Sequence, residues 1–293
     1  MTSLTLSARP PFSLTVVVNS HGWIRLAPFR ENEESGGFTY IARLVSGQVV
    51  ELHIRETSGG VSVETGANLD SSERADVTAK VNWMLGLDQD FSEFYRLARQ
   101  EPKLSQAEVR MQGRVLRSPT LFEDTVKTIL TTNTAWGGTI RMVQALVDLF
   151  GAPLPGDPQK HAFPTPERLA AENLESIDAA RLGYRTPYVL ELAGAVASGA
   201  LDLEAYRFSD LPTLELRKEL LKIKGIGAYA AANLLVLLGR YDFLPVDSWA
   251  LKMVSHEWHR GESIGPAEVE AAFAAWGAWK GLAYWFWDWA YTG

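Results

Sequence analysis

A glycine turn between two apolar stretches is the feature of this chain best suited to hold a phosphate. Gly225-Ile226-Gly227 separates two helices expected over residues 216–224 and 228–238, and both glycines are free to take φ > 0. Backbone N–H groups at the start of the second helix would point outward at the positive end of its dipole. The sequence therefore predicts a helix-hairpin-helix that binds an anion.

Asp247 follows this turn at a fixed distance, after the apolar and extended approach of residues 244–246. It stands where an N-cap belongs, ahead of a helix expected over residues 248–254. A capping carboxylate stays ionised, which suits charge stabilisation or water activation better than acid catalysis. An ordinary cap and an ordinary packing turn are the alternatives, and only the combination of both features is specific.

The pattern K-I-K-G-I-G-x-Y-x-A followed by L-P-V-D resembles the helix-hairpin-helix plus Gly/Pro-Asp (HhH-GPD) signature of the DNA glycosylase superfamily. Residues 118–151 resemble the first core helices of the 8-oxoguanine and 3-methyladenine (type II) branches, and residues 163–167 and 182–185 continue in the same order. The likeness extends from about residue 114 to the C-terminus. It implies an enzyme that flips a damaged base out of double-stranded DNA and cleaves the N-glycosidic bond.

The resemblance assigns roles to the hairpin and the acid. Asp247 would be the catalytic residue that faces the sugar, where a carboxylate stabilises an oxocarbenium-like transition state. The DNA backbone would be held by Lys224, Gly225, Ile226 and Gly227.

Three further DNA-binding residues follow from the same resemblance. Tyr184 would wedge into the duplex, Arg185 would contact the orphaned opposite base, and Asn133 would fill the vacated space. Tyr184 could instead be an ordinary half-buried tyrosine, and Asn133 a helix-end cap.

One departure from the family pattern bears on the reaction. Bifunctional members place a Schiff-base lysine two residues after the second hairpin glycine, and this chain has Tyr229 there. Without that amine no covalent imine with the sugar is expected. Lys252 lies a little over one helical turn past Asp247 and is the alternative amine. The sequence therefore favours a monofunctional, hydrolytic enzyme.

The expected base pocket is formed by Tyr229 of the hairpin and by Trp285 and Asp288 of the C-terminal stretch. Seven of the ten tryptophans fall between Trp249 and Trp289. Electron-rich rings beside a carboxylate favour a cationic alkylated purine, although such a stripe could also be core. In the corresponding C-terminal helix the 8-oxoguanine branch has a glutamine and a phenylalanine, and this chain has Tyr284 and Asp288 instead.

Length and composition set outer limits. A chain of 293 residues has room for two domains, which we place at residues 1–112 and 113–293. The absence of cysteine excludes disulfides, thiol catalysis and the iron–sulfur cluster of the endonuclease III branch. We expect no metal, no cofactor, no membrane contact, a cytoplasmic location and a monomer. The net charge of −7 argues mildly against nucleic acid but does not locate the charges.

The first third of the chain is typical of β structure and the rest of helices. Strands are expected over residues 14–18, 23–26, 38–44, 49–54 and 61–64, and helices over residues 75–86 and 91–100. Residues 151–166 are expected to form the longest loop. The predicted class is α+β, with an N-terminal antiparallel sheet before a helical core.

The predicted function is a monofunctional DNA glycosylase that excises a damaged purine, most simply an alkylated one such as 3-methyladenine. The alternatives are an 8-oxoguanine DNA glycosylase and a non-catalytic DNA-binding protein that senses lesions. The predicted partner in each case is double-stranded DNA that contains a damaged base.

Overall fold

A computed structural model describes residues 1–32, 36–244, 246 and 248–287. The chain forms two compact units, each assembled from two separate segments. Unit 1 comprises Met1–Gln89 and Arg114–Phe208, and unit 2 comprises Asp90–Gly113 and Ser209–Gly293. The domain boundary expected between residues 112 and 113 stays a prediction.

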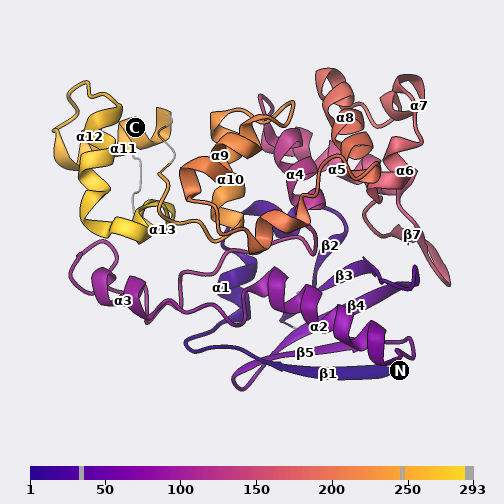
Figure 1. The fold of residues 1–293 in the computed structure, drawn as a ribbon. Coiled ribbons are helices and arrows are strands. Elements are labelled where there is room, and N and C mark those ends of the chain that lie inside the picture. The colour runs from indigo at the N-terminus through magenta and orange to yellow at the C-terminus, as the bar shows by residue number, and fades with distance from the viewer. Residues whose placement is uncertain (33–35, 245, 247, 288–293) are drawn as a thin grey trace. The chain divides into compact units, whose positions relative to one another are not determined.

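An antiparallel five-stranded sheet forms one side of unit 1, in the order β1-β5-β4-β3-β2 (Figure 1). Tyr40 pairs with Phe29 on one neighbouring strand and with Leu52 on the other. Leu52 and Ile54 are fully buried, so one face of the sheet belongs to the core. The strands are β1 (Thr2–Ser7), β2 (Phe29–Asn32), β3 (Gly37–Arg43), β4 (Val49–Thr57) and β5 (Gly60–Thr65).

Helices make up most of the remainder of unit 1. Helix α2 (Ser71–Leu85) contacts the sheet at β1 and begins with a capping box between Asp70 and Glu73. Helix α4 (Leu121–Thr131) is buried along almost its whole length, which makes it the central helix of the unit. The helical elements of unit 1 that follow α4 are α5 (Trp136–Phe150), α6 (Pro166–Ala170), α7 (Leu174–Asp178), η2 (Gly183–Arg185), α8 (Thr186–Ala197) and η3 (Glu204–Phe208).

Unit 2 is helical in its described residues and has an aromatic core. Phe94 packs against Trp276 and Trp279, and Tyr241 stacks on Trp279 with ring centroids 5.7 Å apart. Several of the C-terminal tryptophans are therefore structural. The elements are α3 (Ser92–Ala98), α9 (Thr213–Leu221), α10 (Ala228–Leu237), α11 (Ser248–Trp258), α12 (Pro266–Phe273), η4 (Ala274–Trp279) and α13 (Lys280–Trp285).

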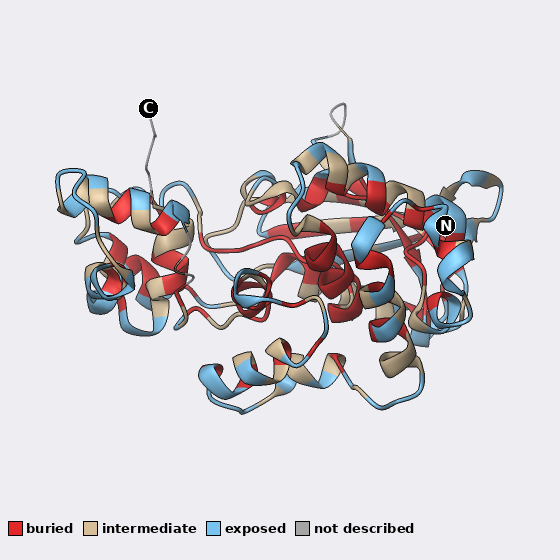
Figure 2. Cartoon of the chain, turned by 90° about the horizontal axis from the view of Figure 1, so that it is seen from above, coloured by how far each residue is buried: buried red, intermediate tan, exposed pale blue. Residues whose placement is uncertain are grey.

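Many helices and strands carry buried residues on one face and exposed residues on another, as expected for elements whose outer face meets water (Figure 2). The predicted α+β class, with an antiparallel sheet ahead of a mostly helical chain, is confirmed. Strands β3, β4 and β5 and helices α2 and α3 lie where they were predicted. Within the described residues, no helix is long and apolar enough to span a membrane.

Two predicted strands are wrong. Residues 14–18 form helix α1 (Leu14–Val18), and residues 22–25 form a 3-10 helix, η1 (Gly22–Arg25). In α1 the buried side chains are Leu14, Val17 and Val18, which is a helical spacing, and burial of that face outweighs the β preference of valine. In η1 the buried Trp23 donates a hydrogen bond to Asp124, which fixes the turn.

Four strands were not predicted. Strand β1 pairs with β5 from Thr2 opposite Thr65, and β2 pairs with β3. The expected loop of residues 151–166 contains a short hairpin, β6 (Pro153–Leu154) with β7 (Asp157–His161). Strand β1 is stabilised by pairing with β5, about sixty residues away, so its own sequence gives little indication of a strand.

Candidate functional site

The predicted helix-hairpin-helix is present in unit 2. Helices α9 and α10 pack against each other, and the turn between them is anchored by the buried side chains of Ile223 and Ile226. The Ile226 N–H donates to the Ile223 carbonyl at 3.0 Å, which closes the turn. Both helices end earlier than expected, at Leu221 and Leu237.

The two hairpin glycines differ in conformation. Gly225 has φ +89°, in the left-handed region, whereas Gly227 is extended with φ −91° and ψ −174°. Gly227 is the N-cap of α10 and supplies no side-chain cap, and the first turn of α10 carries no acidic residue. First-turn amides have no partner within their own helix, so this end of α10 can accept an anion.

The side chains around this turn divide into buried anchors and an exposed rim. Lys224, Gly227 and Tyr229 are exposed, with Tyr229 at 52%. Tyr229 occupies the second position of α10, and its carbonyl accepts a hydrogen bond from Asn233 at 3.2 Å. A backbone amide site and an aromatic ring therefore share one helix end.

The predicted catalytic acid and part of the predicted pocket lie outside the described residues. These are Asp247 and Asp288, whose roles stay predictions. Helix α11 begins at Ser248, as expected for a helix that follows Asp247. Trp285 is the last residue of α13 and is partly buried. Within the described residues, no group of three side chains could hold a metal ion.

In unit 1 the structure brings Asn133 and Tyr184 together, although 51 residues separate them. Asn133 follows the end of α4 with φ +46°, a conformation that asparagine adopts more readily than most residues. Its side-chain amide donates to the Tyr184 hydroxyl at 3.2 Å, and that hydroxyl donates to the Thr132 carbonyl at 3.4 Å. Tyr184 is 50% exposed, so the pair forms a polar and aromatic projection on the surface of the unit.

Arg185 lies beneath this projection and is only 6% exposed. Its guanidinium is 4.4 Å from the centre of the Tyr184 ring and donates to the Thr132 carbonyl. The predicted contact of Arg185 with an opposite base stays a prediction. The Arg185 side chain points into the fold.

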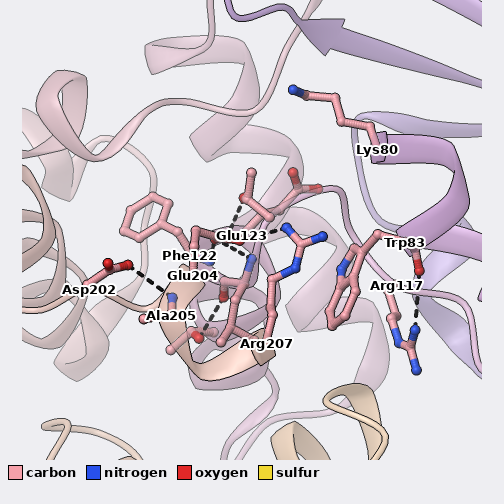
Figure 3. A network of polar contacts seen from close by, with 12 residues as sticks. Lys80, Trp83, Arg117, Phe122, Glu123, Asp202, Glu204, Ala205 and Arg207 are labelled. Atoms are coloured by element: carbon pink, nitrogen blue, oxygen red, sulfur yellow. Dashed lines mark hydrogen bonds and ion pairs between the residues drawn. The ribbon is translucent and has the colours of Figure 1, made fainter. Parts of the chain in front are cut away.

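The N-terminus of α4, opposite the end that precedes this projection, is held by residues that the sequence did not single out. Glu204 accepts hydrogen bonds from the N–H groups of Leu121 and Phe122 at 2.6 and 3.3 Å (Figure 3). Arg207 pairs with Glu204 at 2.9 Å and stacks on Trp83 at 3.9 Å (Figure 3). The carboxylate therefore caps the positive end of α4.

A buried ion pair within α4 is joined to the sheet by a tyrosine of β3. Lys127, which is completely buried, donates to Glu123 at 2.6 Å, and the Tyr40 hydroxyl donates to the other Glu123 oxygen at 2.6 Å. Burial raises the pKa of Tyr40 well above its usual range, and the neighbouring Glu123 carboxylate raises it further. Lys127 and Glu123 are four residues apart on α4, whereas Tyr40 lies 83 residues from Glu123, so no local pattern could have indicated the bond to the sheet.

A second buried carboxylate, Asp124, accepts hydrogen bonds from Trp23 at 2.7 Å and from the Ser118 N–H at 2.9 Å. Burial raises the pKa of Asp124 to about 7 against the opposing effect of these bonds. The His21 ring packs on Trp23 at 4.6 Å, and burial lowers the pKa of His21 to about 4.

A separate cavity of about 600 Å³ lies within unit 1, beside Tyr40, Phe122 and Phe163. None of the residues predicted for the site lines it. Its walls include acids already engaged in structural contacts, such as Glu123 and Glu204. The hairpin and the Asn133–Tyr184 projection, rather than this cavity, carry the chemistry that the sequence predicts.

The family to which these features belong is settled by comparison with known proteins. Residues 126–278 match the model of the HhH-GPD superfamily of base excision DNA repair proteins. The chain belongs to this superfamily. The matched region contains the hairpin, Asp247, Asn133 and Tyr184, whereas Trp285 and Asp288 lie beyond it.

Individual relatives fall in two branches. A DNA-3-methyladenine glycosylase of Bacillus subtilis is 26% identical over 185 residues, which cover 61% of this chain and 60% of the length of that relative. The structure of the 3-methyladenine DNA glycosylase from Archaeoglobus fulgidus is 21% identical, covers 98% of this chain and 97% of its own, and has a TM-score of 0.77.

The other branch is represented by the 8-oxoguanine glycosylase/lyase of Clostridium acetobutylicum. Its DNA-free structure is 20% identical with a TM-score of 0.72, and covers 97% of this chain and 94% of its own. The structure of the same protein bound to DNA with cytosine opposite 8-oxoguanine is 21% identical and has a TM-score of 0.69. The match covers 94% of this chain and 90% of that one. At these identities the two sets of structures show a shared HhH-GPD fold and do not separate the substrates.

Proposed function

We propose that this HhH-GPD protein is a monofunctional DNA glycosylase that excises an alkylated purine, such as 3-methyladenine, from double-stranded DNA. The observation that carries the proposal is the hairpin itself. A glycine turn opens α10 without a side-chain cap, and Tyr229 stands at the position where lyases of the family carry a lysine. The partial match to a bacterial DNA-3-methyladenine glycosylase supports the alkylpurine branch.

In the proposed reaction the protein holds the strand, extrudes the base and stabilises the sugar. The amides at Gly227 and the first turn of α10 bind a DNA phosphate, with Lys224 beside them. Asn133 and Tyr184 enter the duplex and occupy the space that the extruded base leaves. The Asp247 carboxylate stabilises the positive charge that develops on the sugar and orients the attacking water. This hydrolysis requires no cofactor.

The absence of lyase chemistry is tested by borohydride trapping. A lyase forms an imine between an amine and the sugar, and borohydride reduces that imine to a stable protein–DNA adduct. We expect no adduct with abasic DNA, since Tyr229 supplies no amine. A trapped adduct that disappears in Lys252→Ala would contradict the monofunctional proposal and assign the amine to Lys252.

The substrate is tested with a panel of duplexes that carry 3-methyladenine, 7-methylguanine, 8-oxoguanine or an undamaged purine. We expect release of the alkylated bases, whose positive charge favours an aromatic pocket with a carboxylate. Release of 8-oxoguanine alone would contradict the alkylpurine proposal and favour the second candidate.

That second candidate, an 8-oxoguanine DNA glycosylase, is favoured by one observation. Asn133 and Tyr184, which resemble the strand-separating residues of that branch, meet at 3.2 Å. The substitutions at Tyr284 and Asp288 argue against it, and the lesion panel decides between the two. We further expect the protein to be cytoplasmic and to act as a monomer. Size-exclusion chromatography with light scattering measures the oligomeric state.

A further inference from the structure

We propose that Arg185 is a positioning residue that holds Tyr184 and the Thr132–Asn133 turn in the conformation that enters DNA. The proposal rests on the proposed glycosylase function. It concerns the recognition step and makes no assumption about which base is released.

The contacts of Arg185 are directed at the two elements that form the projection. One terminal nitrogen donates to the Thr132 carbonyl, and the other donates to the Leu182 carbonyl at 3.4 Å. The planar guanidinium lies under the Tyr184 ring at 4.4 Å. One side chain therefore ties the turn after α4 to the 3-10 helix η2 and supports the aromatic ring between them.

Tyr184 completes a closed set of contacts with the same turn. Its hydroxyl receives a hydrogen bond from Asn133 at 3.2 Å, lies 3.3 Å from the Thr132 hydroxyl and donates to the Thr132 carbonyl at 3.4 Å. Thr132 is thus held by both side chains. The left-handed conformation of Asn133 directly follows this anchored residue.

Burial separates this role from direct reading of a base. Tyr184 is 50% exposed and Arg185 only 6%, so the ring covers the guanidinium. For Arg185 to reach a base it would have to give up the Thr132 bond and the stack on Tyr184. A buried charge that loses such partners is costly, so the arrangement favours retention of these contacts when DNA binds.

A supporting residue and a base-reading residue have different signatures. If Arg185 acts through Tyr184 and Asn133, its loss weakens insertion into any distorted duplex by the same factor, whatever base stands opposite. A residue that hydrogen-bonds the opposite base instead discriminates among bases.

The test compares Arg185→Met with Arg181→Met, a matched control on an exposed arginine of the same segment. Binding is measured to an undamaged duplex and to duplexes with a tetrahydrofuran abasic analogue opposite A, C, G or T. We expect Arg185→Met to weaken all four abasic complexes by a common factor of roughly ten, as loss of a buried charged hydrogen bond does. Binding to undamaged DNA and binding by the control variant should stay within about twofold of wild type.

Two further readouts distinguish positioning from loss of stability. In a double-mutant cycle, Arg185→Met combined with Tyr184→Ala should cost no more than Tyr184→Ala alone, because the arginine acts through the ring. Hydrogen bonding to Thr132 lowers the pKa of the Tyr184 hydroxyl, and the bond from Asn133 and the Arg185 charge lower it further. The pKa of Tyr184, followed by NMR of labelled tyrosine, should therefore rise in Arg185→Met.

Three results would overturn the proposal: a loss confined to one opposite base, additive effects in the cycle, or an equal loss on undamaged DNA. If Arg185→Met does not fold, Arg185→Lys replaces it, since a lysine keeps the charge but not the planar stack. The same uniform loss, smaller in size, is then expected. Base release by the wild-type protein is assayed separately, so failure of the proposed function is distinguishable from failure of this inference.

Discussion

Two buried titratable side chains in unit 1 contact the same tryptophan and have opposite pKa shifts. The His21 ring packs on Trp23, and Asp124 accepts the Trp23 indole hydrogen bond. Burial lowers the pKa of His21 to about 4 and raises that of Asp124 to about 7. The nearby charge of Lys127 lowers both values.

These shifts predict two opposing contributions to the pH dependence of the unfolding free energy. Between pH 4 and 6.5 the folded state binds fewer protons at His21 than the unfolded state, so stability rises with pH. Over the same range the folded state binds more protons at Asp124, so stability falls, and the two effects oppose each other. Relative to wild type, the unfolding free energy of Asp124→Asn should therefore increase by about 3 kcal/mol from pH 4 to 6.5.

Urea unfolding at a series of pH values measures this difference, and His21→Gln provides the complementary variant. Relative to wild type, its stability should fall as the pH rises from 4 to 6.5. Parallel pH profiles for wild type and both variants would show that neither group titrates as the structure indicates.

The buried pair of Lys127 and Glu123 makes a second prediction at the residue scale. Lys127→Met leaves the Glu123 carboxylate without its cation inside the fold, and should lower the unfolding free energy by about 3–5 kcal/mol. The control is Lys218→Met, whose pair with Glu215 is more than half exposed and should cost no more than about 1 kcal/mol. Similar losses for the two variants in urea unfolding would contradict a buried role for Lys127.

At the scale of elements, the hairpin distinguishes two glycines that look alike in sequence. Gly225 needs the left-handed region at φ +89°, whereas a Cβ at Gly227 would meet nothing within 4 Å in an ordinary extended backbone. Gly225→Ala should therefore destabilise the protein by about 1–2 kcal/mol, and Gly227→Ala should be nearly neutral in thermal unfolding. Equal destabilisation by both would show that the turn has another conformation.

The same elements show what the sequence could predict. The hairpin and strands β3–β5 follow from local patterns of glycine, leucine and β-branched residues. The strand predicted for residues 14–18 is wrong because three consecutive valines favour β structure. The helical spacing of the buried positions, Leu14, Val17 and Val18, becomes visible only in the packed structure. The family resemblance indicated Asn133 and Tyr184 as DNA-binding residues, but it did not predict that they contact each other. That contact spans 51 residues, and the contact of Glu204 with the start of α4 spans 83 residues, so only the packed structure shows them.

At the scale of the whole molecule, an acidic protein is proposed to bind a polyanion. The net charge of −7 repels DNA at long range, so binding must depend on a few local contacts such as Lys224 and the amides of α10. Lys224→Ala should make the slope of log K against log salt shallower by about 0.9. Lys160→Ala removes a lysine that pairs with Glu51 and should leave the slope unchanged.

Fluorescence anisotropy with a labelled abasic-analogue duplex, at several salt concentrations, gives both slopes. Equal slopes for wild type and Lys224→Ala would remove Lys224 from the DNA contact. A shallower slope for Lys160→Ala would show that Lys160 also contacts a DNA phosphate.

Single-turnover release of 3-methyladenine measures the proposed hydrolysis of the glycosidic bond and the proposed role of Asp247 in it. The measurement compares wild type with Asp247→Asn, and uses anisotropy to confirm DNA binding by each. We predict that the variant binds DNA within about twofold of wild type but releases the base on the order of 100-fold more slowly or worse. Base release by the variant at the wild-type rate would contradict the proposed role of Asp247. Release by neither protein would contradict the proposed glycosylase activity and indicate a protein that only binds DNA.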